Sequence, residues 1–206
     1  MSNESEKERD SFTKAEALEK SEFLTASDAP EESEDRALSE YTPGCRTDAL
    51  RLWVYKNETV SEIFKILSHT VVAFTVYALF YRLMLMLESG ELPGALKLSL
   101  ALGAPFVLVS ILRRVINAPR PYELLPFYER QPKKRSGRAF PSRHVFSVFA
   151  IAVALIPAQP LIGASLVLCG VLMAFVRVAL GMHFVRDVLA GGAIGIVSGI
   201  LAILVS

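Results

Sequence analysis

Five long apolar stretches follow one another in the later part of this chain, and they limit its fold more strongly than any other feature. They cover about residues 63 to 87, 94 to 112, 140 to 157, 161 to 180 and 187 to 206. A helix that crosses a bilayer needs about 20 mainly apolar residues. The sequence therefore predicts an all-α integral membrane bundle of about five transmembrane helices, and a soluble globular enzyme is not expected.

The third stretch is the shortest, because Pro141 and Pro157 flank it. We interpret it as a membrane helix, but its length also fits a buried or re-entrant helix. The last stretch contains Gly191, Gly195 and Gly199, a spacing that lets two helix backbones approach closely. Packing inside the bundle is the first interpretation of this stripe, and a homodimer through the same face is the alternative.

The N-terminal part has a different composition. Residues 1 to 48 hold 14 acidic and six basic side chains, whereas the rest of the chain is basic. This segment is rich in Glu, Ser and Asp and lacks a sustained apolar period. We expect a disordered acidic tail over residues 1–47, without signal-peptide features, followed by a membrane domain over residues 48–206. The two cysteines, Cys45 and Cys169, give neither a disulfide framework nor a CxxC spacing, so zinc and iron–sulfur sites are not expected.

A polar segment from Arg113 to Ala139 separates the second and third stretches. It carries eight Lys and Arg residues against Glu123 and Glu129. Such a segment can be a cytoplasmic loop of the positive-inside kind, or it can attract anionic lipid headgroups. The expected partners are therefore the bilayer and an anionic lipid, and no nucleic acid is expected.

Three polar clusters interrupt the apolar part. They read Arg113-x6-Arg120-Pro121, Pro141-Ser142-Arg143-His144 and Arg177-x5-His183-x3-Asp187. If the five helices alternate in direction, all three clusters meet one face of the membrane. Arginine forks and a helix N-terminus at Ser142 both suit phosphate oxygens. His183 and Asp187 are one helical turn apart, so the carboxylate can orient the imidazole as a nucleophile, and His144 remains for general acid catalysis.

These clusters resemble the three signature motifs of the type 2 phosphatidic acid phosphatase superfamily, whose pattern is Lys-x6-Arg-Pro, Pro-Ser-Gly-His and Ser-Arg-x5-His-x3-Asp. The resemblance spans about residues 63 to 206. It implies a metal-independent hydrolysis in which His183 forms a phosphohistidine, Asp187 holds the ring of His183, and His144 protonates the leaving oxygen. It also implies that the phosphoryl oxygens are bound by Arg113, Arg120, Ser142 and Arg177.

Three residues depart from the family pattern. Arg113 replaces the Lys, Val176 replaces the Ser before Arg177, and Arg143 replaces the Gly of the second motif. Glycine permits close approach of backbone to phosphate, but Arg143 keeps its N–H and its guanidinium can add a phosphate contact. We therefore expect an altered substrate preference and an active phosphatase.

The expected activity is hydrolysis of the terminal phosphate of a lipid phosphate or polyprenyl diphosphate at the cell membrane. The alternative is a catalytically impaired membrane protein that binds anionic lipid or a partner. The sequence does not specify the headgroup. Basic loops lie on the motif side and Glu88 and Glu91 on the other, which favours a cytoplasmic active site.

Overall fold

A computed structural model describes residues 44–125 and 137–205. The chain divides into a unit of residues 1–42 and a unit of residues 43–206, and the described residues all belong to the second. The predicted acidic tail therefore lies outside the described residues, except for residues 44–47. Of these, Arg46 and Thr47 already belong to the first described helix.

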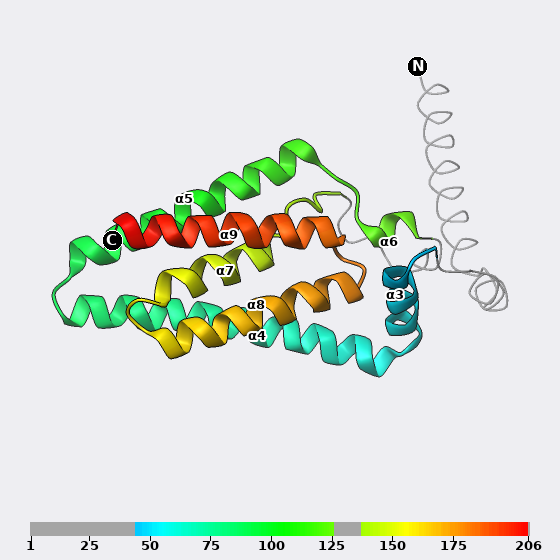
Figure 1. The fold of residues 1–206 in the computed structure, drawn as a ribbon, viewed down its shortest axis with the longest axis horizontal. Coiled ribbons are helices and arrows are strands. Elements are labelled where there is room, and N and C mark those ends of the chain that lie inside the picture. The colour runs from blue at the N-terminus through cyan, green and yellow to red at the C-terminus, as the bar shows by residue number, and fades with distance from the viewer. Residues whose placement is uncertain (1–43, 126–136, 206) are drawn as a thin grey trace, which may run out of the picture. The chain divides into compact units, whose positions relative to one another are not determined.

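The described part is helical. Its helices are α3 (Arg46–Lys56), α4 (Glu58–Glu88), α5 (Leu92–Ile116), α6 (Pro121–Leu124), α7 (Arg143–Leu155), α8 (Pro160–Ala179) and α9 (Val185–Val205) (Figure 1). Five of them overlap the five apolar stretches, while α3 and α6 were not predicted. The structure thus confirms the predicted fold class, an all-α membrane bundle.

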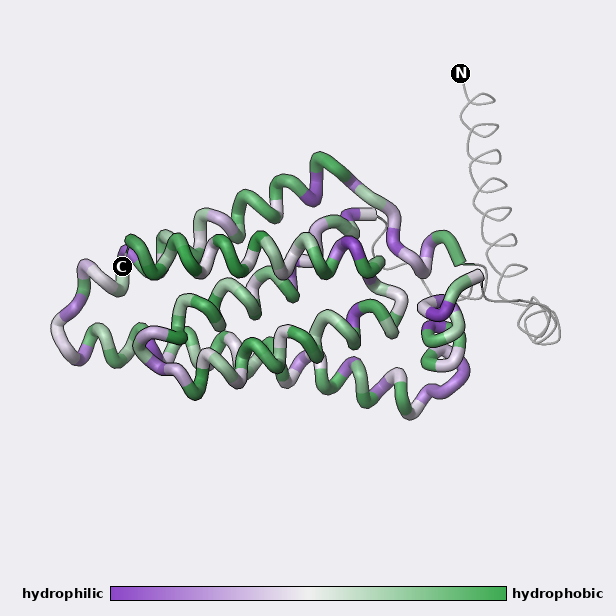
Figure 2. The backbone as a smooth tube through the Cα atoms, viewed as in Figure 1, coloured by the Kyte–Doolittle hydropathy of each residue, from purple (hydrophilic) through white to green (hydrophobic). Residues whose placement is uncertain are grey.

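The outer helices carry the apolar surface of the bundle. Four segments are long and apolar enough to cross a membrane, namely Glu58–Glu88, Leu92–Leu124, Pro160–Ala179 and Val185–Val205. Hydrophobic residues predominate along the long helices (Figure 2). Large apolar side chains such as Leu100, Leu161 and Leu204 are more than 70% exposed on α5, α8 and α9. A surface this apolar is suited to lipid and not to water. The protein is a multi-pass membrane protein.

Helix α7 lies at the centre of the bundle and contacts α4, α5, α8 and α9. It has 13 residues. At 1.5 Å per residue it is about 20 Å long, short of the ~30 Å hydrocarbon core. Val145, Phe146 and Leu155 are at most 1% exposed. The third apolar stretch is therefore a short buried helix enclosed by four longer ones.

The glycine stripe of α9 packs against α7. A Cβ atom on Gly191, Gly195 or Gly199 would meet, in turn, the carbonyl oxygens of Ser142, Phe146 and Ala150. Close backbone approach inside the chain, the first interpretation of the stripe, explains all three glycines. A homodimer stays an untested prediction, but α7 of the same chain already covers this face of α9.

Candidate active site

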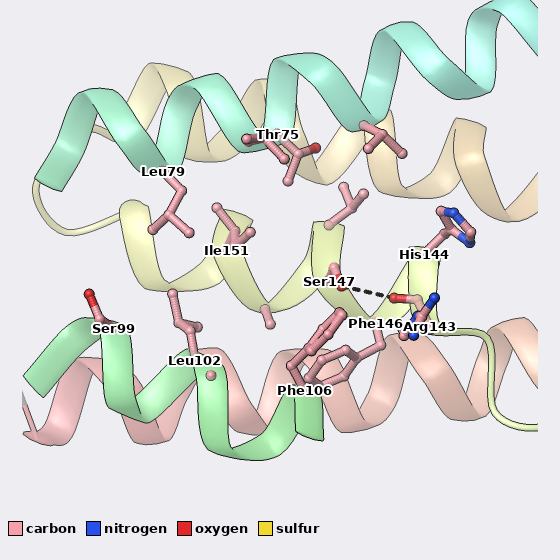
Figure 3. A pocket seen from close by; sticks show the side chains of 15 residues that line it. Thr75, Leu79, Ser99, Leu102, Phe106, Arg143, His144, Phe146, Ser147 and Ile151 are labelled. Carbon is pink, nitrogen blue, oxygen red and sulfur yellow. Dashed lines mark hydrogen bonds between the residues drawn. The ribbon is translucent and has the colours of Figure 1, made fainter. Parts of the chain in front are cut away.

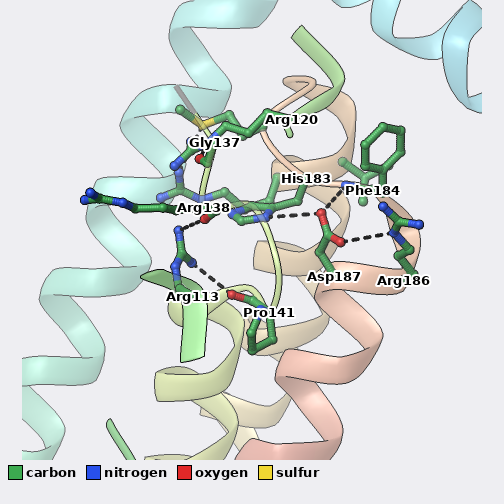
Figure 4. Close-up of polar contacts among 12 residues, drawn as sticks. Arg113, Arg120, Gly137, Arg138, Pro141, His183, Phe184, Arg186 and Asp187 are labelled. Carbon is green, nitrogen blue, oxygen red and sulfur yellow. Dashed lines mark hydrogen bonds and ion pairs between the residues drawn. The ribbon is translucent and has the colours of Figure 1, made fainter. Parts of the chain in front are cut away.

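The three polar clusters meet at one end of the bundle, where α5 ends, α7 begins and the turn between α8 and α9 lies (Figure 4). The Ser142 N–H donates to the Asp187 carbonyl oxygen at 2.9 Å. This bond ties the start of α7 to the start of α9 and brings the second and third clusters together. The expectation that all three clusters share one face is confirmed.

Two arginines of the first cluster hold the backbone that leads into α7. Arg113 Nη1 donates to the Pro141 carbonyl oxygen at 2.9 Å, and its Nη2 donates to the carbonyl oxygen of Arg138. Arg120 Nε donates to the Gly137 carbonyl oxygen at 3.0 Å. Each guanidinium still has further N–H groups, so this anchoring leaves donors for phosphate oxygens.

The short helix α6 fastens the same segment from the other side. The Gly137 N–H donates to Glu123 Oε1 at 2.7 Å, and the Tyr122 N–H donates to the Gly181 carbonyl oxygen at 3.2 Å. The Arg120 guanidinium lies 5.7 Å from the centre of the Tyr122 ring. The first cluster, the loop before α7 and the α8–α9 turn therefore form one connected structure.

His183 and Asp187 are paired as their spacing predicted. Nδ1 of His183 lies 3.7 Å from Asp187 Oδ2, and the two side chains are 3% and 0% exposed. This separation is longer than a hydrogen bond of about 3.2 Å, so the two side chains interact electrostatically without a hydrogen bond. Asp187 Oδ2 also accepts from the Phe184 N–H at 2.8 Å, which fixes the carboxylate. With Nδ1 turned to the carboxylate, Nε2 is the nitrogen left for a substrate.

Burial keeps the His183 imidazole neutral. The side chain lies in the turn between α8 and α9, where burial lowers its pKa below the ordinary 6.5, and the neighbouring Asp187 opposes part of that shift. A neutral imidazole has a free nitrogen lone pair, which a nucleophile requires. The lowered pKa favours the neutral form of His183, which the predicted nucleophile needs.

Helix α7 brings the second cluster to the same place. Ser142 precedes the first helical residue and is fully buried, and its hydroxyl does not cap the helix. The first N–H groups of a helix have no partner within it, and the helix dipole favours an anion there. His144 lies in the first turn and interacts electrostatically with His183 and Arg177. It is therefore near the predicted nucleophile.

Several buried polar atoms of the clusters have no hydrogen-bond partner in the described part of the chain. They are Ser142 Oγ, Arg177 Nε, His183 Nδ1 and Asp187 Oδ1. Arg177 is 9% exposed, and its Nη1 contacts Met182 Sδ at 3.0 Å, a weak acceptor. His183 Nδ1 still lies 3.7 Å from Asp187 Oδ2, and Asp187 Oδ1 lies 3.6 Å from Arg186 Nε. A buried polar group without a hydrogen bond costs about 1–3 kcal/mol, so the gathering of Ser142 Oγ and Arg177 Nε at one place indicates a site for a polar ligand.

Arg143 is directed differently from the other arginines. Its guanidinium lies 5.3 Å from the centre of the Phe106 ring on α5. Together with His144 it lines a pocket of about 460 Å³ between α4, α5 and α7 (Figure 3). Most of the pocket wall is apolar, with Leu79, Leu102 and Ile151 among its residues. The site therefore continues from a polar cradle into an apolar pocket.

Arg51 of α3 is a site residue that the sequence analysis missed. Its side chain is 2% exposed; Nε donates to the Val178 carbonyl oxygen at 3.2 Å and Nη2 to the His183 carbonyl oxygen at 3.3 Å. Nη1 pairs with Asp48 at 2.7 Å, and the guanidinium lies 5.4 Å from the Phe184 ring centre. The one available signal was the Asp48-x2-Arg51 spacing, which pairs the two charges on one helix face.

The described residues contain no group of three or more His, Cys, Asp or Glu side chains placed to hold a metal ion. His69, the third histidine, lies exposed on α4 and belongs to none of the clusters.

Two solved membrane proteins share this fold. The crystal structure of Aquifex aeolicus LpxE superimposes with a TM-score of 0.51 and 28% identity, covering 68% of this chain and 92% of that one. The crystal structure of the first transmembrane PAP2 type phosphatidylglycerolphosphate phosphatase from Bacillus subtilis superimposes with a TM-score of 0.53 and 23% identity, covering 87% and 89%. No curated protein sequence matches the chain.

The family comparison covers the part of the chain that carries all three clusters. The sequence model of the PAP2 superfamily matches residues 94–206, which is more than half of the chain and includes everything from Arg113 to Asp187. The chain belongs to the PAP2 superfamily.

Proposed function

We propose that this protein is a membrane lipid phosphatase that removes the terminal phosphate of a lipid phosphate or diphosphate through a phosphohistidine. The observation that carries the proposal is the buried pair of His183 and Asp187, 3.7 Å apart, beside several arginines. A protein that only binds anionic lipid needs the positive charge, but it does not need a buried imidazole oriented by a carboxylate.

In the first step, His183 Nε2 attacks phosphorus in line. The Nε2–P bond forms as the bond between phosphorus and the leaving oxygen breaks, and His144 gives a proton to that oxygen. Burial and the charge of Arg177 lower the pKa of His144 to about 3, so His144 takes up this proton when the phosphate anion binds and offsets the positive charge around it. Arg113, Arg120 and Arg177 stabilise the charge on the phosphoryl oxygens, as do the N–H groups at the start of α7. Asp187 stabilises the positive charge that develops on the His183 ring.

In the second step, water replaces the enzyme at phosphorus. His144, now deprotonated, takes a proton from the water as its oxygen bonds to phosphorus, and the Nε2–P bond breaks. Inorganic phosphate leaves and both histidines return to their starting states.

A lipid substrate suits the surroundings of the site better than a soluble ester does. The pocket that His144 lines is walled by apolar side chains of α4, α5 and α7 and has the volume of a typical ligand site. An acyl or prenyl chain can occupy it while the headgroup stays at the polar end. Phosphatidic acid, phosphatidylglycerol phosphate and a polyprenyl diphosphate all offer a terminal phosphoryl group to this cradle.

The test is phosphate release by detergent-purified protein on those three lipids, with a chelator present. Wild type should release phosphate, and His183→Ala should lose at least about 10³-fold in kcat while staying folded. His69→Ala is the matched control, because it removes an exposed histidine outside the clusters and should keep full activity.

Two results would contradict the proposal. Full activity in His183→Ala would show that His183 is not the nucleophile. If folded wild type released no phosphate from any of the three lipids but still bound anionic vesicles, the result would favour the catalytically impaired lipid binder.

A further inference from the structure

Arg143 has no role in the two steps above, although it directly precedes His144. Within residues 44–125 and 137–205 its guanidinium makes no hydrogen bond or ion pair, and it lies over the Phe106 ring, 5.3 Å from the ring centre. The side chain is only half exposed. A partly buried guanidinium held in place without a counter-charge is suited to bind an anion.

The pocket beside Arg143 offers few other polar groups. The hydroxyls of Thr75 and Ser99 donate to the Val71 and Ala95 carbonyl oxygens of their own helices, at 2.7 and 2.8 Å. Ser147 Oγ likewise donates to the Arg143 carbonyl oxygen at 2.9 Å. The side-chain donors left to a ligand in this pocket are those of Arg143 and His144. A fitting ligand is therefore apolar along most of its length and anionic at the end next to these two residues.

The position of Arg143 relative to His144 indicates which part of a substrate it meets. His144 protonates the leaving oxygen, so atoms beyond that oxygen extend from His144 into the pocket that both residues line (Figure 3). In a lipid monophosphate those atoms are carbon. In a lipid diphosphate they are the phosphate that the lipid keeps after the terminal phosphate has been removed.

We infer that Arg143 is a specificity-determining residue that binds the retained phosphate of a lipid diphosphate. The inference rests on the proposed function and narrows its substrate class. Arg113 and Arg120 are tied to backbone carbonyl oxygens around the cradle, whereas Arg143 stacks on Phe106 at the polar end of the apolar pocket. A glycine at this position would have neither the positive charge nor a side chain long enough to contact that phosphate.

The test compares kcat/KM for farnesyl diphosphate and farnesyl monophosphate, which share one apolar chain, in detergent. Wild type should prefer the diphosphate. Arg143→Gly should lower the ratio of diphosphate to monophosphate kcat/KM by about 10- to 100-fold, the range of a charge-assisted hydrogen bond. Arg143→Lys should keep part of the preference, because it retains the charge without the fork. Arg113→Lys is the matched control. It should change kcat/KM for both substrates by the same factor, since Arg113 belongs to the cradle.

The inference is overturned if Arg143→Gly lowers kcat/KM for both substrates by the same factor, or if wild type does not prefer the diphosphate. In either case hydrolysis of the monophosphate by wild type would leave the proposed function standing. If folded wild type hydrolysed neither farnesyl probe, the inference would also be overturned. The proposed function would be contradicted only if the three lipids named above released no phosphate either.

Discussion

Arg51 Nη2 donates to the backbone carbonyl oxygen of His183 at 3.3 Å, so helix α3 holds the residue proposed as nucleophile. The same guanidinium reaches the Val178 carbonyl oxygen at 3.2 Å. Arg51 thus links the end of α8 to the turn between α8 and α9. None of the three motifs includes this residue.

Replacing Arg51 should impair catalysis through the position of His183. In Arg51→Ala the two carbonyl oxygens and Asp48 lose their partner, which costs about 1–3 kcal/mol and releases the turn. We expect kcat to fall by about tenfold or more with a smaller change in KM, because a misplaced nucleophile affects the reaction more than binding. Steady-state kinetics and a thermal transition in detergent measure the two effects.

The control for this prediction is Arg46→Ala, which removes an exposed arginine from the same helix. Arg51→Lys should recover part of the activity, because it restores one donor. If Arg51→Ala lowered the thermal transition but left kcat unchanged, the residue would serve stability alone.

The contact between α9 and α7 predicts opposite effects at two adjacent glycines. A Cβ on Gly191 would collide with the Ser142 carbonyl oxygen, whereas a Cβ on Gly192 would lie 3.6 Å from the Phe149 ring in ordinary contact. Gly191→Ala should therefore push apart the starts of α7 and α9, lowering both the thermal transition and activity. Gly192→Ala should be neutral or stabilising by up to about 1 kcal/mol, since alanine favours the helix. Equal behaviour of the two variants would mean that the helices do not approach at Gly191.

Much of this arrangement was predictable from the sequence, for identifiable reasons. Runs of apolar residues fix where helices form, and alternation of their direction brings Arg113, His144 and His183 to one face. The burial of α7 was not predictable in the same way, because an apolar residue that faces lipid and one that faces protein look alike in the sequence. Only the length between Pro141 and Pro157 hinted at a helix too short to span.

Contacts between distant segments were the part that the sequence did not reveal. Arg51 binds backbone carbonyl oxygens, which every residue has, so nothing at Val178 or His183 marks the partner. The direction of Arg143 was likewise open, because an arginine in the second motif could reach either the phosphate cradle or the pocket. Its stacking on Phe106 depends on how α5 packs against α7.

The lowered pKa of His183 predicts that acid destabilises the protein through this residue. Because the pKa of His183 is lower in the folded chain than its ordinary 6.5, the unfolded chain binds more protons than the folded chain as the pH falls below 6.5. Stability is therefore complete above pH 6.5 and falls as the pH decreases below it, by at most about 1.4 kcal/mol per pH unit. Thermal transitions of wild type and His183→Asn should converge as the pH falls from about 7 to about 5. Parallel curves would show that His183 titrates alike in both states.

The charge distribution and the fold together predict how the protein is oriented in the membrane. Helix α9 begins at the motif end of the bundle and finishes at the opposite end, near the turn between α4 and α5 (Figure 1). That turn carries Glu88 and Glu91, whereas the described arginines around the site lie at the motif end. The positive-inside rule then predicts a site that faces the cytoplasm and a C-terminus that lies outside. A reporter active only outside the cytoplasm should work when fused after residue 206 or inserted at Gly90, and should fail at the N-terminus. The opposite pattern would put the active site outside, and it would mean that the arginines are there for phosphate and do not set the topology.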